Sequence, residues 1–307
     1  MKKVNIITPV YNNQDSLQIL VDSVYKLKKN INVQISHTLI DDGSTDQSWK
    51  ILETLKKKYN NVNLIKLVKN YGQSHAVEVG LNFNNYDAYV VINADLQDPV
   101  ELIRDMINSF IAGKKTVIGQ RVNRNDGFFS NIISRVAWSI LKKLTFKNLP
   151  QGGFDFYLID DLVRKRVTRF KNKNIFIQGR ILDSGIDFET IPYTRKKREL
   201  GKSQYNFFSR TYLFLDVVFG YSLNPFRIIS IFGFLSFGVS IILGLIFFVN
   251  YFFIVQPLPG WTSTVLIIIF LFSINFLILS IVLEFLWRII SITDNTHDVI
   301  IEKIIDE

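Results

Sequence analysis

The feature that most limits how this chain can fold is a long apolar stretch in its last third. Residues 228–283 contain no Asp, Glu, Lys, Arg or His. A water-soluble fold rarely leaves so large an apolar surface exposed, whereas ~20 apolar residues suffice for a helix to cross a bilayer core. A turn rich in helix breakers, QPLPGW at residues 256–261, divides the stretch. The sequence therefore predicts a membrane hairpin of two helices, near residues 229–255 and 264–286.

Charged residues beside the two apolar spans predict their orientation. Arg227 precedes the first span and Arg288 follows the second, while the turn between them has no basic residue. The positive-inside rule therefore places both ends of the hairpin in the cytoplasm. Trp261 and Trp287 stand where interfacial aromatic residues tend to lie, and Glu284 can pair with Arg288 at helical spacing. A signal anchor or a pair of buried helices is the alternative interpretation.

Charge is distributed unevenly between the two parts of the chain. Residues 1–226 carry 33 basic and 21 acidic side chains, whereas the remainder carries 3 and 6. A basic domain ahead of an apolar anchor suits an anionic membrane surface or phosphorylated substrates. No nucleic-acid motif accompanies the charge, so nucleic acid is not an expected partner. The chain has no cysteine, which excludes disulfides, thiolate metal sites and cysteine nucleophiles.

The first hundred residues alternate short apolar runs with amphipathic stretches, which is the pattern of βαβ units. The expected strands are residues 4–10, 36–40, 62–68 and 88–92, and the expected helices are 16–28, a segment through 49–55, and 75–82. A polar cluster follows each strand. Because the carboxyl ends of parallel strands meet at one edge of a sheet, we expect a single site built from these clusters. The alternative is four ordinary loops.

Two further segments have apolar residues along one side. Residues 128–146 are interpreted as a helix that either faces the core or lies in the membrane interface. Residues 206–221 are rich in aromatic side chains immediately before the anchor, which favours an interfacial helix there. The expected organisation is a globular domain (1–205), a juxtamembrane amphipathic segment (206–227), two transmembrane helices (228–288) and a cytoplasmic tail (289–307).

The polar cluster after the fourth expected strand has the composition of a metal site. Its sequence is NADLQDP, residues 93–99. Asp95 supplies a carboxylate at the strand end, and Gln97 supplies an amide oxygen two residues later. Such a pair can hold Mg²⁺ or Mn²⁺ and leave coordination positions open for a diphosphate. A cation there would neutralise the charge that develops on a departing nucleoside diphosphate.

The cluster after the second expected strand contains two adjacent carboxylates, Asp41 and Asp42. If the metal lies at Asp95, these carboxylates are available to hydrogen-bond a base or a ribose hydroxyl. The alternative is that Asp42 and the following residues only form a turn and a helix cap. His37 and His75 are interpreted as structural or solvated side chains rather than as an acid or a base.

Six motifs together resemble a known family. They are TPVYNN (8–13), DDGSTD (41–46), NYGQSHAVEVGL (70–81), NADLQDP (93–99), GGFDFYLID (152–160) and RELGKSQY (198–205). The chain resembles the family 2 glycosyltransferases of GT-A fold, and within them the polyprenyl-phosphate branch that includes dolichol-phosphate mannose synthase and the bacterial glucosyl transferases of O-antigen modification. DDGS is widespread in the family, whereas ADLQDP and R-x-x-G-x-S before a membrane hairpin are more selective.

The resemblance implies an α/β, Rossmann-like GT-A domain followed by interfacial helices and a two-helix transmembrane hairpin in the cell (inner) membrane, with the catalytic domain cytoplasmic. It implies transfer of one hexose, from UDP-glucose or a related UDP-sugar, to polyprenyl (undecaprenyl) phosphate with inversion, for cell-envelope glycan modification. The cofactor would be Mg²⁺ or Mn²⁺, and a homo-oligomer such as a tetramer is implied. The alternatives are a processive polysaccharide synthase, whose Gln-x-x-Arg-Trp signature is absent, and a non-catalytic membrane scaffold.

The resemblance also assigns roles to individual residues. The implied metal ligands are Asp95 and Gln97. The implied nucleotide-sugar contacts are Pro9, Tyr11, Asn12, Asp41, Asp42 and Asp95. The implied acceptor-phosphate contacts are Arg121, Arg135, Arg198, Lys202 and Ser203. The catalytic set is Asp95, Gln97, Asp155 and Arg198, with Asp155 orienting a sugar hydroxyl or contributing to the metal site.

The chain departs from the family pattern at Asn13, Gln14 and Tyr157. Because a polyprenyl phosphate is already an anion, no strong general base is expected.

Overall fold

The chain folds into two units, which are described separately. The computed structural model describes residues 1–27, 31–122, 150, 153–169, 176–195, 224–253, 260–293 and 299–306. The first unit comprises Met1–Val217 with Thr296–Glu307, and the second comprises Val218–Asn295. The helix expected at 128–146 and the interfacial helix expected at 206–221 lie outside the described residues.

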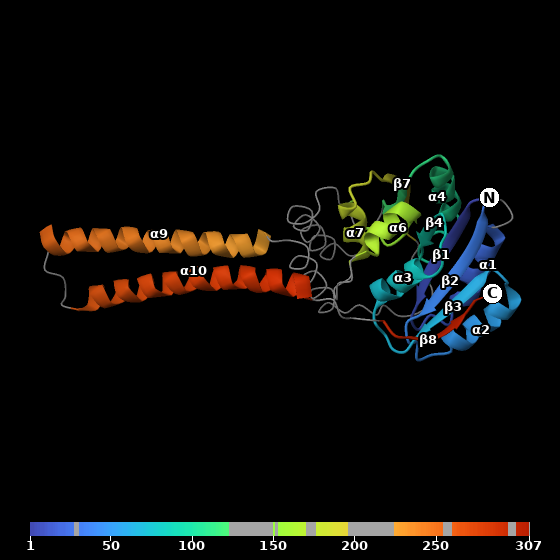
Figure 1. Ribbon diagram of the computed structural model, residues 1–307, viewed down its shortest axis with the longest axis horizontal. Coiled ribbons are helices and arrows are strands. Elements are labelled where there is room, and N and C mark those ends of the chain that lie inside the picture. The colour runs from blue at the N-terminus through green and yellow to red at the C-terminus, as the bar shows by residue number, and fades with distance from the viewer. Residues whose placement is uncertain are drawn as a thin grey trace. The chain divides into compact units, whose positions relative to one another are not determined.

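The first unit is built on an eight-stranded sheet with the order β7-β5-β6-β4-β1-β2-β3-β8. Figure 1 shows β4, β1, β2, β3 and β8 following one another across this sheet. Its strands are β1 (Lys3–Val10), β2 (Gln34–Asp41), β3 (Val62–Leu67), β4 (Ala88–Val91), β5 (Thr116–Arg121), β6 (Tyr157–Asp160), β7 (Glu189–Tyr193) and β8 (Ile301–Ile305). Strand β1 runs parallel to β2 and β4, and β2 runs parallel to β3. The four strands expected in the first hundred residues are therefore confirmed. Strands β6 and β8 run antiparallel to their neighbours, so the sheet is mixed.

Helices cover both faces of this sheet. One apolar cluster contains residues of α1 (Leu17–Leu27), α2 (Ser48–Lys58) and α4 (Leu102–Ile111). The other contains residues of α3 (Gln73–Asn82), α6 (Asp161–Val167) and α7 (Ile177–Asp183). Successive side chains of β4 alternate between the clusters, because Val90 belongs to the first while Tyr89 and Val91 belong to the second. Burial on both faces explains why the strands are almost continuously apolar.

The last strand was not anticipated in the expected tail. Strand β8 pairs antiparallel with β3, beside which it lies in Figure 1. Glu302 forms an ion pair with Lys66 at 2.8 Å, and Lys303 forms one with Glu53 at 3.0 Å. The strand is short, contains two charges and leaves most of its side chains exposed. A strand at a sheet edge without a buried face shows little hydrophobic alternation, which is why the sequence pattern does not reveal it.

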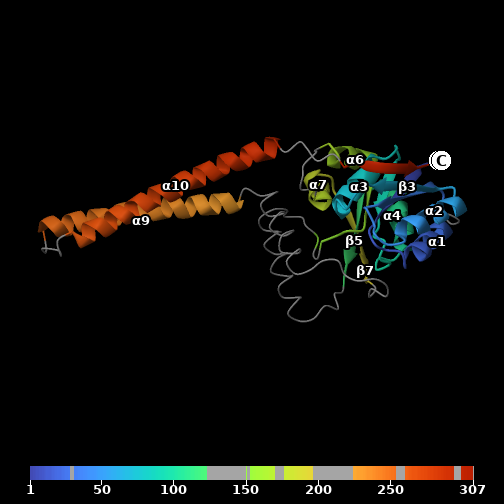
Figure 2. The same cartoon turned by 90° about the horizontal axis from the view of Figure 1, so that it is seen from below.

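The second unit contains two long helices, α9 (Asn224–Phe253) and α10 (Trp261–Thr293). They lie side by side in Figure 1 and cross in the view of Figure 2, and the hydroxyls of Ser236 and Ser273 are 3.2 Å apart between them. Among the described residues, one helix is long and apolar enough to cross a membrane, Ser263–Leu283 of α10, with a mean hydropathy of 3.0. The comparable apolar part of α9 is shorter, Ile231–Ile246. A helical hairpin is therefore present, while its double crossing of a membrane stays a prediction.

Candidate active site

The loops that follow β1, β2, β3 and β4 are hydrogen-bonded to one another at a single edge of the sheet. Asn12, after β1, donates its N–H to the Ser44 hydroxyl at 3.1 Å, and its Oδ1 accepts the Thr45 N–H at 2.8 Å. At the start of α3, Gln73 donates from Nε2 to Asn93 Oδ1 at 2.7 Å, which joins the loops after β3 and β4. The expectation that the four polar clusters lie together is thus confirmed.

Asp42 fastens the loops after β2 and β3. Its Oδ1 accepts the Tyr71 N–H at 2.7 Å and its Oδ2 accepts the Gly72 N–H at 2.9 Å. The adjacent Gly43 has φ +66°, and a Cβ there would lie 2.5 Å from the Lys69 carbonyl carbon. Only glycine suits such a turn, because a side chain would be strained by φ and would also collide with backbone. The turn-stabilising role that the sequence left open for Asp42 is therefore present.

Asp41 is buried in a different way. Neither of its carboxylate oxygens makes a hydrogen bond to a residue in the described part of the chain. Burial raises the pKa of Asp41, and Ser44 only partly opposes this effect. Burial likewise raises the pKa of Asp42, against the opposing N–H groups of Tyr71 and Gly72. Asp41 is therefore the member of the pair with acceptor capacity to spare, because Ser44 lies near it without a hydrogen bond of normal geometry, whereas both oxygens of Asp42 are used.

The remaining residues of the expected nucleotide-sugar set lie at the same edge. Pro9 is buried at the end of β1 and lies in register with Ile40 of β2. Tyr11 is half-buried, and its N–H donates to Asn13 Oδ1 at 3.2 Å. We call the loops at residues 11–14, 42–48 and 70–73 the hydrogen-bonded half of the site.

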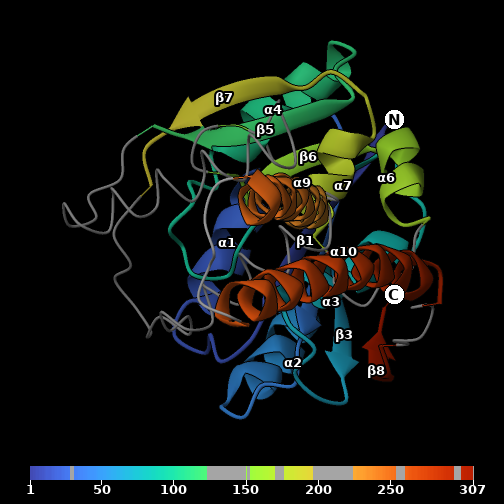
Figure 3. The same ribbon diagram turned by 90° about the vertical axis from the view of Figure 1, so that its left-hand side faces the viewer.

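The other side of the same edge is assembled by the order of the sheet. Strands β5 and β7 lie side by side in Figure 3 and run parallel. Arg121 is in register with Tyr193 at their carboxyl ends. Strand β6 runs antiparallel between β4 and β5, so Asp155, just before its first residue, reaches the edge at which β4 and β5 end. The polar residues here are called the charged half of the site: Asp95, Gln97, Asp98, Arg121, Asp155, Gln178, Tyr193 and Arg195.

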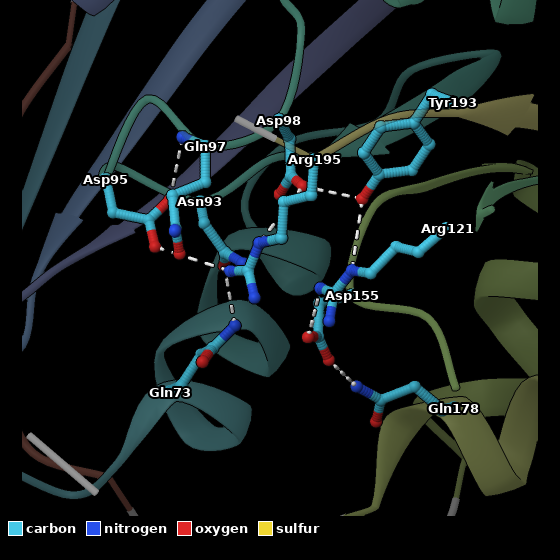
Figure 4. Close-up of polar contacts among 10 residues, drawn as sticks. All are labelled: Gln73, Asn93, Asp95, Gln97, Asp98, Arg121, Asp155, Gln178, Tyr193 and Arg195. Atoms are coloured by element: carbon cyan, nitrogen blue, oxygen red, sulfur yellow. Dashed lines mark hydrogen bonds and ion pairs between the residues drawn. The ribbon is translucent and has the colours of Figure 1, made fainter. Parts of the chain in front are cut away.

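Arg121 is held by two contacts in the charged half (Figure 4). Its Nη2 lies 2.7 Å from Asp155 Oδ2, and its Nε donates to the Tyr193 hydroxyl at 3.2 Å. The other oxygen of Asp155 accepts Gln178 Nε2 at 3.0 Å. Tyr193 in turn donates its hydroxyl to Asp98 Oδ1 at 2.5 Å. The guanidinium side chain is only 7% exposed, so its position is fixed by partners rather than by solvent.

The pKa values of the charged half follow from burial and from these pairs. Burial opposes the charge on Asp155, but Arg121 outweighs it and holds the pKa of that carboxyl below its ordinary value. Burial raises the pKa of Asp98, and the nearby arginines and Tyr193 only partly offset that rise. Burial and Asp98 together raise the pKa of the Tyr193 phenol. Asp155 is therefore an ion-paired carboxylate and is poorly suited to act as a base.

Asp95 lies in a tight turn after β4. Its Oδ1 accepts the Gln97 N–H at 3.2 Å, and Leu96 between them has φ +59°. Its Oδ2 faces Arg195, whose Nη2 is 3.5 Å away. Arg195 Nε lies 3.8 Å from Asp98 Oδ1, so one guanidinium adjoins two carboxylates (Figure 4).

The donor set at Asp95 fits only one kind of metal site. Within the described ranges no group of three His, Cys, Asp or Glu side chains could enclose a metal ion. One carboxylate with a nearby amide suits Mg²⁺ or Mn²⁺ that takes its other ligands from water and substrate phosphates. The position of Arg195 further shows that this carboxylate faces a place where positive charge is accommodated.

The structure brings together most of the expected site residues. Asp95, Gln97, Arg121 and Asp155 lie in the charged half. Of the other expected nucleotide-sugar contacts, Tyr11, Asn12 and Asp42 lie in the hydrogen-bonded half, and Pro9 and Asp41 lie beside it at the ends of β1 and β2. Four expected acceptor contacts lie outside the described residues: Arg135, Arg198, Lys202 and Ser203. Tyr157, where the sequence departs from the family pattern, is buried in the core and packs edge-on against Phe154.

Sequence reasoning missed four members of the charged half: Asp98, Gln178, Tyr193 and Arg195. Asp98 belongs to the NADLQDP motif, but the sequence assigned it no role. Gln178 lies on α7 and Tyr193 ends β7, far along the chain from Asp155 and Asp98. Arg195 opens the basic run RKKR at residues 195–198, in which nothing distinguishes the first arginine from its neighbours. One signal that could have revealed two of them is the close spacing of Tyr193 and Arg195 at the end of β7, whose side chains alternate between exposed and partly buried positions.

Comparison with known families decides the class of this protein. The Glycosyl transferase family 2 domain matches residues 5–163. The chain belongs to this family. The matched region of this glycosyltransferase includes the hydrogen-bonded half of the site and the part of the charged half from Asp95 to Asp155. Gln178, Tyr193 and Arg195 lie beyond it.

Two curated relatives and one solved structure are similar to this glycosyltransferase. The SfII prophage-derived bactoprenol glucosyl transferase of Shigella flexneri is 24% identical over 98% of both chains. The undecaprenyl-phosphate 4-deoxy-4-formamido-L-arabinose transferase of Photorhabdus laumondii is 28% identical over 76% of this chain and 72% of its own length. Glucosyl-3-phosphoglycerate synthase of Mycobacterium tuberculosis, solved with Mn²⁺, uridine diphosphate and glucosyl-3-phosphoglycerate, superposes with a TM-score of 0.51 at 15% identity, covering 71% of this chain and 78% of the other. This last likeness shows the GT-A-like fold.

Proposed function

We propose that this glycosyltransferase moves a single hexose from a nucleotide-sugar to polyprenyl phosphate, with inversion at the anomeric carbon, to supply sugar for cell-envelope glycan modification. The observation that carries the proposal is the presence, in one chain, of a site suited to a metal and two phosphates and of a helix apolar enough to cross a membrane. A lipid phosphate acceptor accounts for both features. The names of the two curated relatives agree with it.

The hydrogen-bonded half would bind the nucleoside of the donor. Asp41 has unused acceptor oxygens, whereas both oxygens of Asp42 already accept backbone N–H groups. A nucleoside would therefore gain more from Asp41, while Asp42 keeps the pocket wall in place together with Asn12. Pro9 and Tyr11 would frame the base. The donor is proposed to be UDP-glucose or a related UDP-sugar, which the bactoprenol glucosyl relative and the uridine diphosphate of the solved structure support.

Asp95 and Gln97 would hold the divalent cation. When bound, Mg²⁺ or Mn²⁺ would neutralise the negative charge that accumulates on the departing diphosphate. Asp95 directs its Oδ2 toward Arg195, and the turn at Leu96 brings the Gln97 N–H to the Oδ1 of Asp95. The Mn²⁺ bound by glucosyl-3-phosphoglycerate synthase supports the use of a divalent cation.

Arg121 would orient the acceptor phosphate, together with Arg135, Arg198, Lys202 and Ser203. A guanidinium binds phosphate oxygens through two parallel N–H groups, and contacts to Asp155 and Tyr193 fix the direction of this one. A phosphate oxygen of the lipid would attack the anomeric carbon. The bond from that carbon to the diphosphate would break, and its electron pair would leave with the nucleoside diphosphate.

Asp155 would act as a positioning residue in this reaction. Its pairing with Arg121 lowers its pKa, so it has little tendency to take a proton. The attacking phosphate is already ionised near neutral pH, so it needs no base. The same carboxylate could still orient a sugar hydroxyl, since it is 36% exposed.

The membrane anchor is proposed to be the α9–α10 hairpin, with both ends and the catalytic unit on the cytoplasmic side of the inner membrane. The apolar segment of α10 and the distribution of arginines in the sequence support this topology. Residues 1–205 would form the catalytic domain and 206–227 an amphipathic connection to the lipid surface. Assembly into a homo-oligomer such as a tetramer is part of the proposal.

The direct test is sugar transfer into organic-extractable lipid. Purified protein would be given undecaprenyl phosphate, a panel of radiolabelled UDP- and GDP-sugars, and Mg²⁺ or Mn²⁺, with EDTA as the metal control. We expect labelled lipid from one UDP-hexose, lost with EDTA. Arg198→Ala should raise the KM for the lipid more than the KM for the donor.

Two results would contradict the proposal. Label that appears on a growing glycan rather than on lipid would indicate a processive synthase. No transfer from any donor, combined with no metal-dependent nucleotide binding, would indicate a non-catalytic scaffold.

A further inference from the structure

Two arginines serve the charged half, and they are held very differently. Arg121 is 7% exposed and makes contacts of 2.7 Å and 3.2 Å to Asp155 and Tyr193. The side chain of Arg195 is 30% exposed, and its two carboxylate contacts are longer, at 3.5 Å and 3.8 Å. Its buried Nε donates no hydrogen bond to any residue in the described ranges. Arg121 is therefore a fixed part of the site, whereas Arg195 is held mainly by charge.

The position of Arg195 coincides with the side of Asp95 that would take a cation. Its Nη2 faces Asp95 Oδ2, while Asp95 Oδ1 is occupied by the Gln97 N–H. A divalent ion and a guanidinium at the same carboxylate oxygen repel each other, so each weakens the binding of the other. A metal bound at Asp95 Oδ2 would therefore favour withdrawal of Arg195.

Without a metal, Arg195 has a clear electrostatic role. Three carboxylates lie in the charged half, those of Asp95, Asp98 and Asp155, and Arg121 directly pairs with only the last of them. Arg195 lies against the other two, and Asp98 is almost completely buried. Arg121 also acts on Asp98. Without Arg195, however, the repulsion between the Asp95 and Asp98 carboxylates would be offset less, and both would be costlier to keep ionised.

We propose that Arg195 stands in for the divalent cation in the ligand-free enzyme, and that the metal displaces it from Asp95 when it enters with the donor diphosphate. This inference rests on the proposed function, because it assumes that Asp95 binds the metal. Competition from Arg195 weakens binding of the metal alone. The diphosphate supplies further ligands and restores the affinity, so metal binding is coupled to nucleotide binding.

The test measures Mn²⁺ binding rather than turnover. Free Mn²⁺ would be followed by its electron paramagnetic resonance signal during titration of full-length protein in detergent, with and without UDP. Arg195→Gln removes the competing charge, and Arg169→Gln removes an equal charge from an exposed position after α6 as the matched control. For Mn²⁺ alone, we expect Arg195→Gln to lower the Kd about twofold to fivefold, the range that loss of one partly exposed ion pair implies. Arg169→Gln should leave the Kd unchanged.

A second pair of variants locates the effect at Asp95. In an Asp95→Asn background, Arg195→Gln should no longer change the Kd for Mn²⁺, because the contested carboxylate is gone. Arg195→Lys keeps a cation that is more compact and more strongly hydrated, so it should give a smaller gain than Arg195→Gln. This variant provides the comparison should Arg195→Gln fail to fold, which its thermal melting curve would reveal.

The outcomes separate this inference from the proposed function. Equal Kd values for Mn²⁺ alone in wild type and both Arg195 variants, with tight binding in the presence of UDP, would overturn the inference and leave the proposed function standing. An equal gain in the Asp95→Asn background would also overturn it. Absence of Mn²⁺ binding by every variant even with UDP would overturn both.

Discussion

The two halves of the candidate site are built from different interactions. The hydrogen-bonded half is held by neutral or backbone donors, such as the N–H groups of Tyr71 and Gly72 that bind Asp42. The charged half is held by side chains that meet from β4, β5, β6 and β7, such as the pair of Arg121 with Asp155. In the first arrangement the N–H groups of Tyr71 and Gly72 already have an acceptor, and the Asp41 carboxylate beside them keeps acceptor capacity for a ligand. The second contains charges that a metal and two phosphates can exchange or share.

This difference suggests a division of labour. Loops whose backbone is already satisfied hold their shape and can select a nucleoside with little rearrangement. Ion pairs that are partly exposed are weak and can be replaced by stronger ionic partners during a catalytic cycle. We therefore expect substitutions in the charged half to change turnover more than folding, and substitutions in the hydrogen-bonded half to change folding at least as much as turnover.

The largest effect is expected at Asp95. Asp95→Ala removes the carboxylate proposed to hold the metal, so turnover should fall by about a thousandfold or more while thermal stability changes little. Asp105→Ala, on the exposed side of α4, is the matched control and should keep wild-type turnover. Transfer of labelled sugar into lipid would provide the rate. Turnover within tenfold of wild type would show that Asp95 does not hold the metal. It would also contradict the proposed difference between the two halves.

Arg121 should give the next largest effect. Arg121→Gln removes the guanidinium proposed to orient the acceptor, and we expect kcat/KM for the lipid to fall by about a hundredfold. Arg121→Lys should recover only part of this loss, because an ammonium does not reproduce the forked contact. Initial rates at varied lipid and fixed donor would measure both variants. A loss confined to the donor KM would place Arg121 on the nucleotide side instead.

Gly43 should show the strongest folding effect in the hydrogen-bonded half. Gly43→Ala introduces both an unfavourable φ and a Cβ 2.5 Å from the Lys69 backbone, so it should lower the free energy of unfolding by about 2 kcal/mol or more. Gly113→Ala is the control, since φ there is +101° but no atom lies within 4 Å of the added Cβ. Its cost should be about 1 kcal/mol. Denaturant melts would decide, and equal losses would show that close packing at Gly43 is unimportant.

Adjacent carboxylates should respond in opposite directions at neutral pH. Asp42→Asn leaves one of the Tyr71 and Gly72 N–H groups without an acceptor, at a cost of about 1 to 3 kcal/mol. Asp41→Asn removes a buried charge that lacks a hydrogen-bond partner within the described residues, so it should stabilise the fold by about 1 kcal/mol. It should also weaken UDP binding, which calorimetry would measure. Destabilisation by both variants would mean that Asp41 has a structural partner.

The smallest effects concern pH, and again the halves differ in sign. Because the folded-state pKa of Asp41 is raised, its ionised form lowers stability above that pKa, and this cost disappears as pH falls through it. The advantage of Asp41→Asn should therefore shrink on acidification.

Because the folded-state pKa of Asp155 is lowered, its contribution to stability is present above the unfolded-state pKa and is lost as pH falls through the folded-state pKa. Asp155→Asn should therefore melt below wild type at neutral pH and approach it in acid, as thermal scans across pH would show.

The regular elements of the first hundred residues follow from local patterns. Strands β1 to β4 and helices α1 and α3 were expected within a few residues of their observed bounds, because burial on both sheet faces produces unbroken apolar runs. Strand β8 escaped notice because its side chains are mostly exposed and it owes its conformation to pairing with β3. The two halves of the site differ in the same way. The hydrogen-bonded half consists of short continuous motifs that can be recognised in the sequence, whereas the charged half is assembled from residues far apart in the chain.

The sequence by itself determined the family, the sheet edge at which the polar clusters gather, and the carboxylate and amide of the NADLQDP turn. These depend on interactions among residues close in the chain, which leave periodic and motif patterns. Only the tertiary structure decided that Arg195 adjoins Asp95, that Tyr193 joins Asp98 to Arg121, and that β8 forms one edge of the sheet. These contacts join residues about 70 to 240 positions apart, and their partners are set by strand order rather than by any local preference.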